Sequence, residues 1–118
     1  MEEQNNPKVI ICMSTYNGEK YVKEQLESLL NQTYKNIEIY VRDDGSKDNT
    51  INILEDYQKQ NKIHFIKGKN VGVVGSFYEC LKEAYSNAEY FAYCDQDDKW
   101  HTDKIEKAIT KLSEKSQE

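Results

Sequence analysis

The feature that most constrains the fold is a fourfold alternation of short apolar segments with amphipathic ones. Residues 9–13, 37–41, 63–66 and 90–94 are brief runs rich in β-branched and aromatic residues, as expected of buried strands. Each run precedes a segment whose apolar residues recur at helical spacing, over about 20–31, 51–57, 74–85 and 105–112. The sequence therefore predicts an α/β fold: a Rossmann-like three-layer α/β/α sandwich around a mostly parallel four-stranded sheet.

Length and charge narrow the class of protein further. The 118 residues suit one domain, and we expect an extended or disordered N-terminus over residues 1–7 and one folded unit over residues 8–115. A net charge of −5 argues against binding to nucleic acid or to an anionic membrane, because both favour basic surfaces. No apolar run approaches the ~20 residues of a membrane-spanning helix, and no signal peptide is visible.

The cysteines indicate a reducing environment. Cys12, Cys80 and Cys94 are odd in number, form no C-x-x-C pair, and include two that lie inside apolar strand-like runs. This pattern predicts buried free thiols rather than a disulfide framework or a zinc site. We therefore expect a cytoplasmic location.

An acidic loop follows the last predicted strand. Asp95, Asp97 and Asp98 stand within four positions directly after an apolar run. Like charges about 4 Å apart repel by roughly 1 kcal/mol in water and roughly 4 kcal/mol at an effective dielectric constant of 20, so a divalent cation would relieve the crowding. Ligands of open α/β sheets bind at the carboxyl ends of the strands, which is where this loop lies. The alternative is a solvated acidic turn that caps the next helix.

Two further loops leave the same predicted edge. Asp43 and Asp44 end the second strand, and either could accept hydrogen bonds from a base or a ribose, although Asp44 with Gly45 also suits a simple Asx-turn. After the first strand, Tyr16 offers a flat face for a base, while its neighbours Thr15 and Asn17 offer hydrogen bonds. A turn with a tyrosine folded onto the sheet edge explains that segment equally well.

The loop after the third strand combines Lys69 and Asn70 with Gly72. It contains no G-K-[ST] sequence and is therefore not a Walker A motif. No G-x-G-x-x-G sequence follows the first strand, so a dinucleotide-binding Rossmann domain loses its main support.

Several of these motifs together resemble one known family. The stretch "STYNGEKYVKEQLESLLNQTY" is followed by "DDGSKDNT" and later by "CDQDDKWHTDKI". In this order and at these spacings, the chain resembles the nucleotide-binding half of a family-two glycosyltransferase with the GT-A fold. The resemblance extends from about residue 8 to residue 112, and "NVGVVGSF" makes it similar to rhamnosyl- and galactosyltransferase-like members.

The resemblance implies a role for each loop. Thr15 and Tyr16 would line the base pocket of a nucleotide-diphosphate sugar donor, and Asp44 would hydrogen-bond a pyrimidine base. Asp97 would reach the ribose or the metal, and Asp98 would coordinate Mn²⁺ or Mg²⁺ at the diphosphate. The donor-binding residues that it implies are Thr15, Tyr16, Asn17, Asp43, Asp44, Asn70, Gly72, Asp95 and Asp97, with Asp97 and Asp98 as metal ligands.

The resemblance also implies a longer enzyme. In the family, a second half holds the site for the glycan or lipid-linked acceptor and a catalytic base, and this sequence shows no E-D pair or Q-x-x-R-W segment after residue 98. We therefore expect the chain to bind donor without transferring sugar, to bind no nucleic acid, and to self-associate through uncovered surface. The full-length enzyme would be inverting and cytoplasmic, or peripheral at the inner face of the plasma membrane.

Other classes of function remain open at this point. A nucleotidyltransferase would also join an α/β sheet to acidic metal ligands, but its phosphate loop needs more Gly, Arg and Lys than "STYNGEK" offers. A receiver-like, acidic Mg²⁺-binding module would need a later strand that carries a lysine. A fragment without any ligand is the fourth possibility, and retained nucleotide binding separates it from the first.

Overall fold

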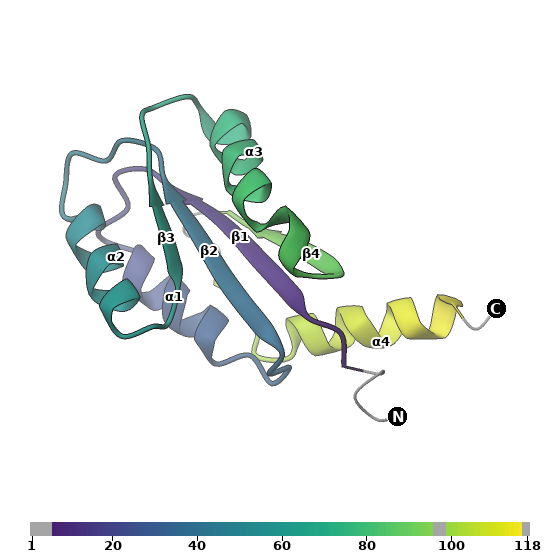
Figure 1. Cartoon of the computed structure of the whole chain (residues 1–118). Helices are drawn as coiled ribbons and strands as arrows, with labels where there is room; N and C mark the ends of the chain where they lie inside the picture. Colours follow the sequence, from purple (N-terminus) through teal and green to yellow (C-terminus); the bar gives the residue numbers. More distant parts are fainter. Residues whose placement is uncertain (1–5, 96–98, 117–118) are drawn as a thin grey trace.

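A computed structural model describes residues 6–95 and 99–116 and confirms the predicted architecture. Its strands are β1 (Val9–Thr15), β2 (Ile37–Asp43), β3 (His64–Lys67) and β4 (Tyr90–Cys94). They pair in the order β3-β2-β1-β4, and every pairing is parallel. The first strand of the chain is therefore central, and β3 and β4 form the two edges (Figure 1).

Helices cover both faces of this sheet. They are α1 (Val22–Leu30), α2 (Thr50–Lys59), α3 (Val73–Ala84) and α4 (Lys104–Ser116), with a short 3₁₀ turn, η2 (Tyr85–Asn87), after α3. α3 packs on one face, while α1, α2 and α4 contribute side chains to the core on the other (Figure 1). The three-layer sandwich expected from the sequence is thus confirmed.

Side chains of β1 alternate between the two halves of the core. Val9, Ile11 and Met13 join the larger cluster beneath α1 and α2, while Ile10 and Cys12 join the smaller one beneath α3. All seven residues of β1 are buried, as expected for a central parallel strand that is covered on both faces. The three cysteines are buried and free, as predicted.

The two central strands are longer than their apolar runs. β1 continues through Ser14 and Thr15, and β2 continues through Arg42 and Asp43. The extra residues pair with each other in register, Ser14 with Arg42 and Thr15 with Asp43. These polar side chains stay in the sheet because each finds a buried hydrogen-bond partner, which removes the cost that would otherwise end a strand there.

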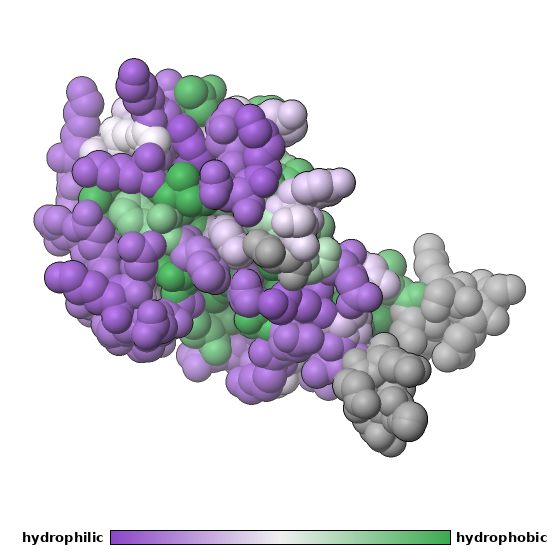
Figure 2. All heavy atoms as spheres, in the orientation of Figure 1, coloured by the Kyte–Doolittle hydropathy of each residue, from purple (hydrophilic) through white to green (hydrophobic). Residues whose placement is uncertain are grey.

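Apolar residues are exposed at one edge of the sheet. Tyr90 and Phe91 on the edge strand β4 are exposed, and α4 extends away from the sheet (Figure 1). Figure 2 shows that hydrophilic side chains cover most of the face seen in that view, with hydrophobic atoms visible between them. Among the described residues, no helix combines the length and apolar character that crossing a membrane requires.

Candidate functional site

A pocket of about 400 Å³ opens at the carboxyl ends of β1, β2 and β4. Four of the residues predicted from the sequence line it, namely Thr15, Tyr16, Asp44 and Asp95. Ser14, Val73 and Tyr93 complete the lining, and sequence reasoning did not select them. Parallel strands bring these loops together because their carboxyl ends share one edge of the sheet, so the pocket lies where an open α/β sheet binds its ligands.

Asp43 organises the turn behind this pocket. Its Oδ1 accepts hydrogen bonds from Thr15 Oγ1 at 2.8 Å and Ser46 Oγ at 2.6 Å, and its Oδ2 accepts from the backbone N–H groups of Gly45 and Ser46 at 3.1 and 2.7 Å. Asp43 is fully buried. The Asx-turn considered for Asp44 is therefore made by Asp43, with Gly45 at φ +91° supplying the left-handed conformation.

Asp44 binds the loop between β3 and α3. Its Oδ1 accepts from the backbone N–H of Val71 at 2.8 Å, and its Oδ2 accepts from that of Gly72 at 3.1 Å. The guanidinium of Arg42 donates to the same Oδ1 at 2.9 Å, which forms an ion pair with both side chains almost fully buried. Sequence reasoning missed Arg42. It lies two residues after Tyr40 in β2, so the side chains of both residues face α3.

The remaining predicted residues that the structure describes lie around the pocket rather than in its lining. Asn17, at φ +50°, joins the first two loops: its N–H donates to Ser46 Oγ and its Oδ1 accepts from the N–H of Lys47, both at 2.8 Å. Gly72 contacts Asp44 and precedes α3 at φ +89°, while Asn70 is exposed beside Gly45. Asp97 and Asp98 lie outside the described residues.

Tyr93 and Asp95 share one side of the end of β4. The Tyr93 ring packs edge-on against Phe77, with ring centroids 4.5 Å apart. Burial, the charge of the Asp95 carboxylate and a hydrogen bond to it raise the pKa of Tyr93 to about 12. Tyr93 therefore keeps its proton at neutral pH and acts as a hydrogen-bond donor in the pocket.

The raised pKa of Tyr93 predicts an alkaline loss of stability. A tyrosine has a pKa of about 10 when unfolded, so the stabilisation is complete below pH 10 and disappears as the pH rises through about 12. We expect the difference in free energy of unfolding between wild type and Tyr93→Phe to be constant from about pH 7 to 10 and to shrink above it. Urea unfolding across this range measures that difference, and one that stays constant up to pH 12 would contradict the assignment.

Two buried glutamines bind the chain on either side of the acidic loop. One lies in α1, and the other follows the C-terminal end of α1. The Gln25 amide donates to Cys94 Sγ at 3.1 Å and to the carbonyl of Asp95. Gln32 donates to the carbonyl of His101 at 2.7 Å and accepts from the N–H of Ile105 at 3.0 Å. Gln25 interrupts the apolar stripe of α1 three residues after Val22, and that signal could have identified it in the sequence, whereas Gln32 lies beyond the end of the helix.

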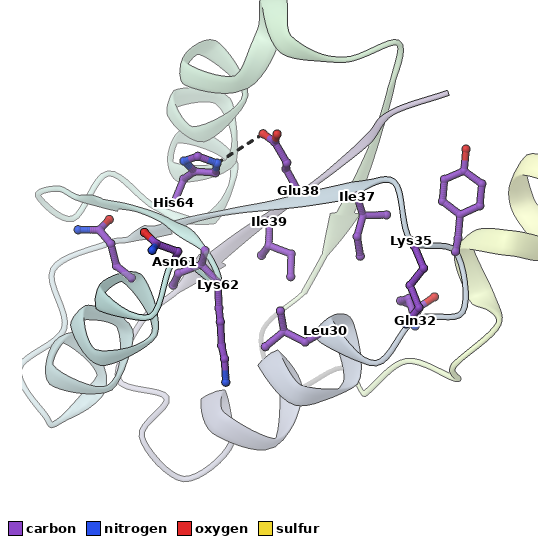
Figure 3. Close-up of a pocket in the computed structure, with 12 residues that line it drawn as sticks. Leu30, Gln32, Lys35, Ile37, Glu38, Ile39, Asn61, Lys62 and His64 are labelled. Carbon is purple, nitrogen blue, oxygen red and sulfur yellow. Dashed lines mark ion pairs between the residues drawn. The ribbon is translucent and has the colours of Figure 1, made fainter. Parts of the chain in front are cut away.

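A second, larger pocket of about 570 Å³ lies near the opposite end of β2 and β3. Leu30, Ile37 and Ile39 point into it between β2 and α1, whereas Glu38 and His64 form an ion pair across the ribbon from them (Figure 3). None of the residues predicted to bind donor lines this pocket. Despite its size, it is not where the polar loops meet.

Comparison with known proteins assigns the chain to a family. The family model for glycosyl transferase family 2 matches residues 10–117. The dTDP-rhamnosyl transferase RfbG of Shigella flexneri is 40% identical over 102 residues, which are 82% of this chain and 35% of that protein. The putative teichuronic acid biosynthesis glycosyltransferase TuaG of Bacillus subtilis is 33% identical over 112 residues, which are 93% of this chain and 44% of that protein. The chain thus spans less than half the length of either relative.

Solved structures agree with this assignment. S. aureus TarS 1-349 in complex with UDP-GlcNAc has a TM-score of 0.77 and 30% identity, over 91% of this chain and 31% of that one. The mannosyltransferase PcManGT from Pyrobaculum calidifontis, in complex with GDP-Man and Mn²⁺, has a TM-score of 0.82 over 92% of this chain and 33% of that one, at 21% identity. These likenesses confirm the expected GT-A fold. The chain therefore belongs to glycosyl transferase family 2.

Proposed function

We propose that this chain is the donor-binding portion of a metal-dependent, inverting glycosyltransferase that uses a UDP- or dTDP-sugar. The acceptor would be a polysaccharide or a lipid-linked glycan, and the full-length enzyme would act in the cytoplasm or at the inner face of the plasma membrane. The observation that carries the proposal is the convergence of Thr15, Tyr16, Asp44 and Asp95 on one pocket at the carboxyl edge of a parallel sheet.

The described residues suggest how a base would be held. The Tyr16 side chain is 43% exposed and lines the pocket, so its ring can stack on a nucleobase. Asp44 would accept a hydrogen bond from the single ring N–H that uracil and thymine present. Asp43 would act indirectly, because its four hydrogen bonds fix the turn that carries Asp44.

A divalent cation fits the chemistry of the acidic loop. Mg²⁺ and similar hard cations prefer carboxylate oxygens, and Asp95 supplies one to the pocket. Within residues 6–95 and 99–116, no group of three or more His, Cys, Asp or Glu side chains could hold an ion. The metal assignment therefore depends on Asp97 and Asp98. When bound, Mn²⁺ or Mg²⁺ would act as a Lewis acid toward the diphosphate leaving group.

The full reaction would need parts beyond donor binding. TarS, RfbG and TuaG are each more than twice as long as the segment that matches this chain. The acceptor site and the catalytic base are therefore proposals for the whole enzyme, and no residue of this chain is assigned as the base. Self-association through exposed apolar residues, such as those on β4, also stays a prediction.

Titration calorimetry of UDP and of dTDP, with and without Mn²⁺, tests the proposal. We expect metal-dependent binding in the wild type that is lost in the double variant Asp97→Ala/Asp98→Ala. We expect Tyr16→Ala to weaken binding by about tenfold, because stacking of a base on an aromatic ring contributes roughly 1–3 kcal/mol. Tyr21→Ala is the matched control, since Tyr21 is similarly exposed but does not line the pocket.

The outcomes separate the proposal from its alternatives. Absence of nucleotide binding in a folded chain would contradict donor binding and favour a fragment without a ligand. Binding of Mg²⁺ without any nucleotide would instead favour the acidic Mg²⁺-binding module. Equal weakening by Tyr16→Ala and Tyr21→Ala would show that the pocket described above is not the site.

A further inference from the structure

Arg42 is a buried cation that the donor-binding proposal does not use. Only 6% of its surface is exposed, on the side of β2 that faces α3. Its Nη1 donates to Asp44 Oδ1 at 2.9 Å and to Ser76 Oγ at 3.0 Å, and its Nη2 donates to the carbonyl of Lys69 at 3.1 Å. Ser14 adds a hydrogen bond to Ser76 at 2.6 Å. The guanidinium therefore fixes β2, α3 and the loop that follows β3 around one carboxylate.

These contacts occupy the two carboxylate oxygens of Asp44 to different extents. An ionised carboxylate offers about two acceptor positions on each oxygen. Oδ1 is filled, because it accepts from both Arg42 and the N–H of Val71. Oδ2 accepts only from the N–H of Gly72 among the described residues. Asp44 thus keeps one acceptor position, and it belongs to Oδ2.

The shape around Gly68 maintains this arrangement. A Cβ at position 68 would lie 2.1 Å from Arg42 Nη2 and 2.5 Å from its Cζ, well inside contact distance. Gly68 also donates its N–H to the carbonyl of Asp43 at 3.0 Å, which holds the loop against β2. The guanidinium can occupy its place only because residue 68 has no side chain.

We propose that Arg42 is a specificity-determining residue of the donor pocket: by filling Asp44 Oδ1, it selects a base with one N–H donor against a base with two. Uracil and thymine present one ring N–H between two carbonyls, which matches the single free position. Guanine presents a ring N–H and an adjacent amino group, which a carboxylate satisfies best with both oxygens. This inference rests on the proposed function, in which Asp44 meets the base.

The same fold accommodates both kinds of base. TarS 1-349 is a complex with UDP-GlcNAc and PcManGT a complex with GDP-Man, and both superpose on this chain with TM-scores above 0.7. The overall fold therefore does not decide between uracil and guanine. The choice must come from local groups, and in this chain the pairing of Arg42 with Asp44 is such a group.

The test compares the dissociation constants of GDP and UDP, measured calorimetrically with Mn²⁺, for the wild-type chain and for Arg42→Met. Methionine keeps an apolar stem of similar length and removes every donor. We expect the ratio of the GDP constant to the UDP constant to fall by about tenfold, the effect of regaining one hydrogen bond to a charged acceptor. Lys35→Met is the control, because it removes an exposed cation at the opposite end of the sheet.

Each outcome bears on a distinct statement. If the wild type binds neither UDP nor dTDP, the proposed function fails first. If it binds UDP and a folded Arg42→Met variant keeps the wild-type ratio, the role of Arg42 is overturned. Should Arg42→Met not fold, Gly68→Ala answers the same question, because it displaces the guanidinium while keeping the arginine. We expect the same fall in the ratio, and an unchanged ratio in that folded variant also overturns the inference.

Discussion

Replacement of Asp43 by alanine will destabilise this chain by about 3–5 kcal/mol, because it removes a fully buried carboxylate that accepts four hydrogen bonds. Two backbone N–H groups, of Gly45 and Ser46, and two hydroxyls, of Thr15 and Ser46, lose their acceptor. Native domains are stable by only about 5–15 kcal/mol, so this loss is a large share of the total. It lowers the melting temperature by roughly 12–20 °C.

Calorimetric or circular-dichroism melting of Asp43→Ala measures this loss. The matched control is Asp56→Ala, since Asp56 is an exposed carboxylate on α2 whose side chain accepts a hydrogen bond from the exposed Gln60 at 3.1 Å. We expect the control to change stability by no more than about 0.5 kcal/mol. A loss below about 1 kcal/mol in Asp43→Ala would mean that the turn finds other acceptors, and the structural role given to Asp43 would be wrong.

Replacement of Gln32 by leucine will cost about 2–4 kcal/mol, chiefly by detaching the start of α4 from α1. Gln32 is fully buried, and leucine can fill its volume but cannot accept from Ile105 N–H or donate to the carbonyl of His101. In the variant, the N–H of Ile105 and the carbonyl of His101 would find hydrogen-bond partners only if the start of α4 moved to where water can reach them. We therefore expect faster amide hydrogen exchange over residues 99–106 before any global unfolding.

Hydrogen exchange resolved by mass spectrometry tests this prediction. Gln60→Leu is the control, because Gln60 is exposed at the C-terminal end of α2 and its amide donates to the exposed Asp56. Protection of residues 99–106 should be unchanged in that variant. Uniform loss of protection throughout Gln32→Leu would indicate a general loss of stability and would contradict a local role at the start of α4.

Much of the fold could be predicted because the hydrophobic pattern repeats without interruption. Apolar runs of four or five residues located all four strands, and their alternation with helices predicted the parallel sheet. The ends of β1 and β2 could not be predicted, because Ser14 and Arg42 are residues that usually leave the core. They remain in the sheet through mutual contacts with Ser76 on α3, a partner more than 30 residues away from either.

The candidate site also contains residues that could be predicted from the sequence and residues that could not. Thr15, Tyr16, Asp44 and Asp95 could be selected because each lies within three residues of the end of a predicted strand. Tyr93 could not, because its sequence position suits a core aromatic residue and only the structure places it beside Asp95. For Asp43 and Asp44, the sequence offered two equivalent carboxylates, and tertiary contacts assign one to the turn and the other to the loop before α3.

The order of the strands also determines how this chain must fold. β1 precedes the other three strands in the sequence, yet it lies inside the sheet and pairs with β4, where Val9 meets Tyr90. Closing so long a loop is entropically costly, and parallel pairings distant in sequence slow folding. Until β4 has emerged from the ribosome, the apolar edge of β1 has no partner on that side. Of the four strands, β1 is therefore the one that most needs protection from aggregation during synthesis.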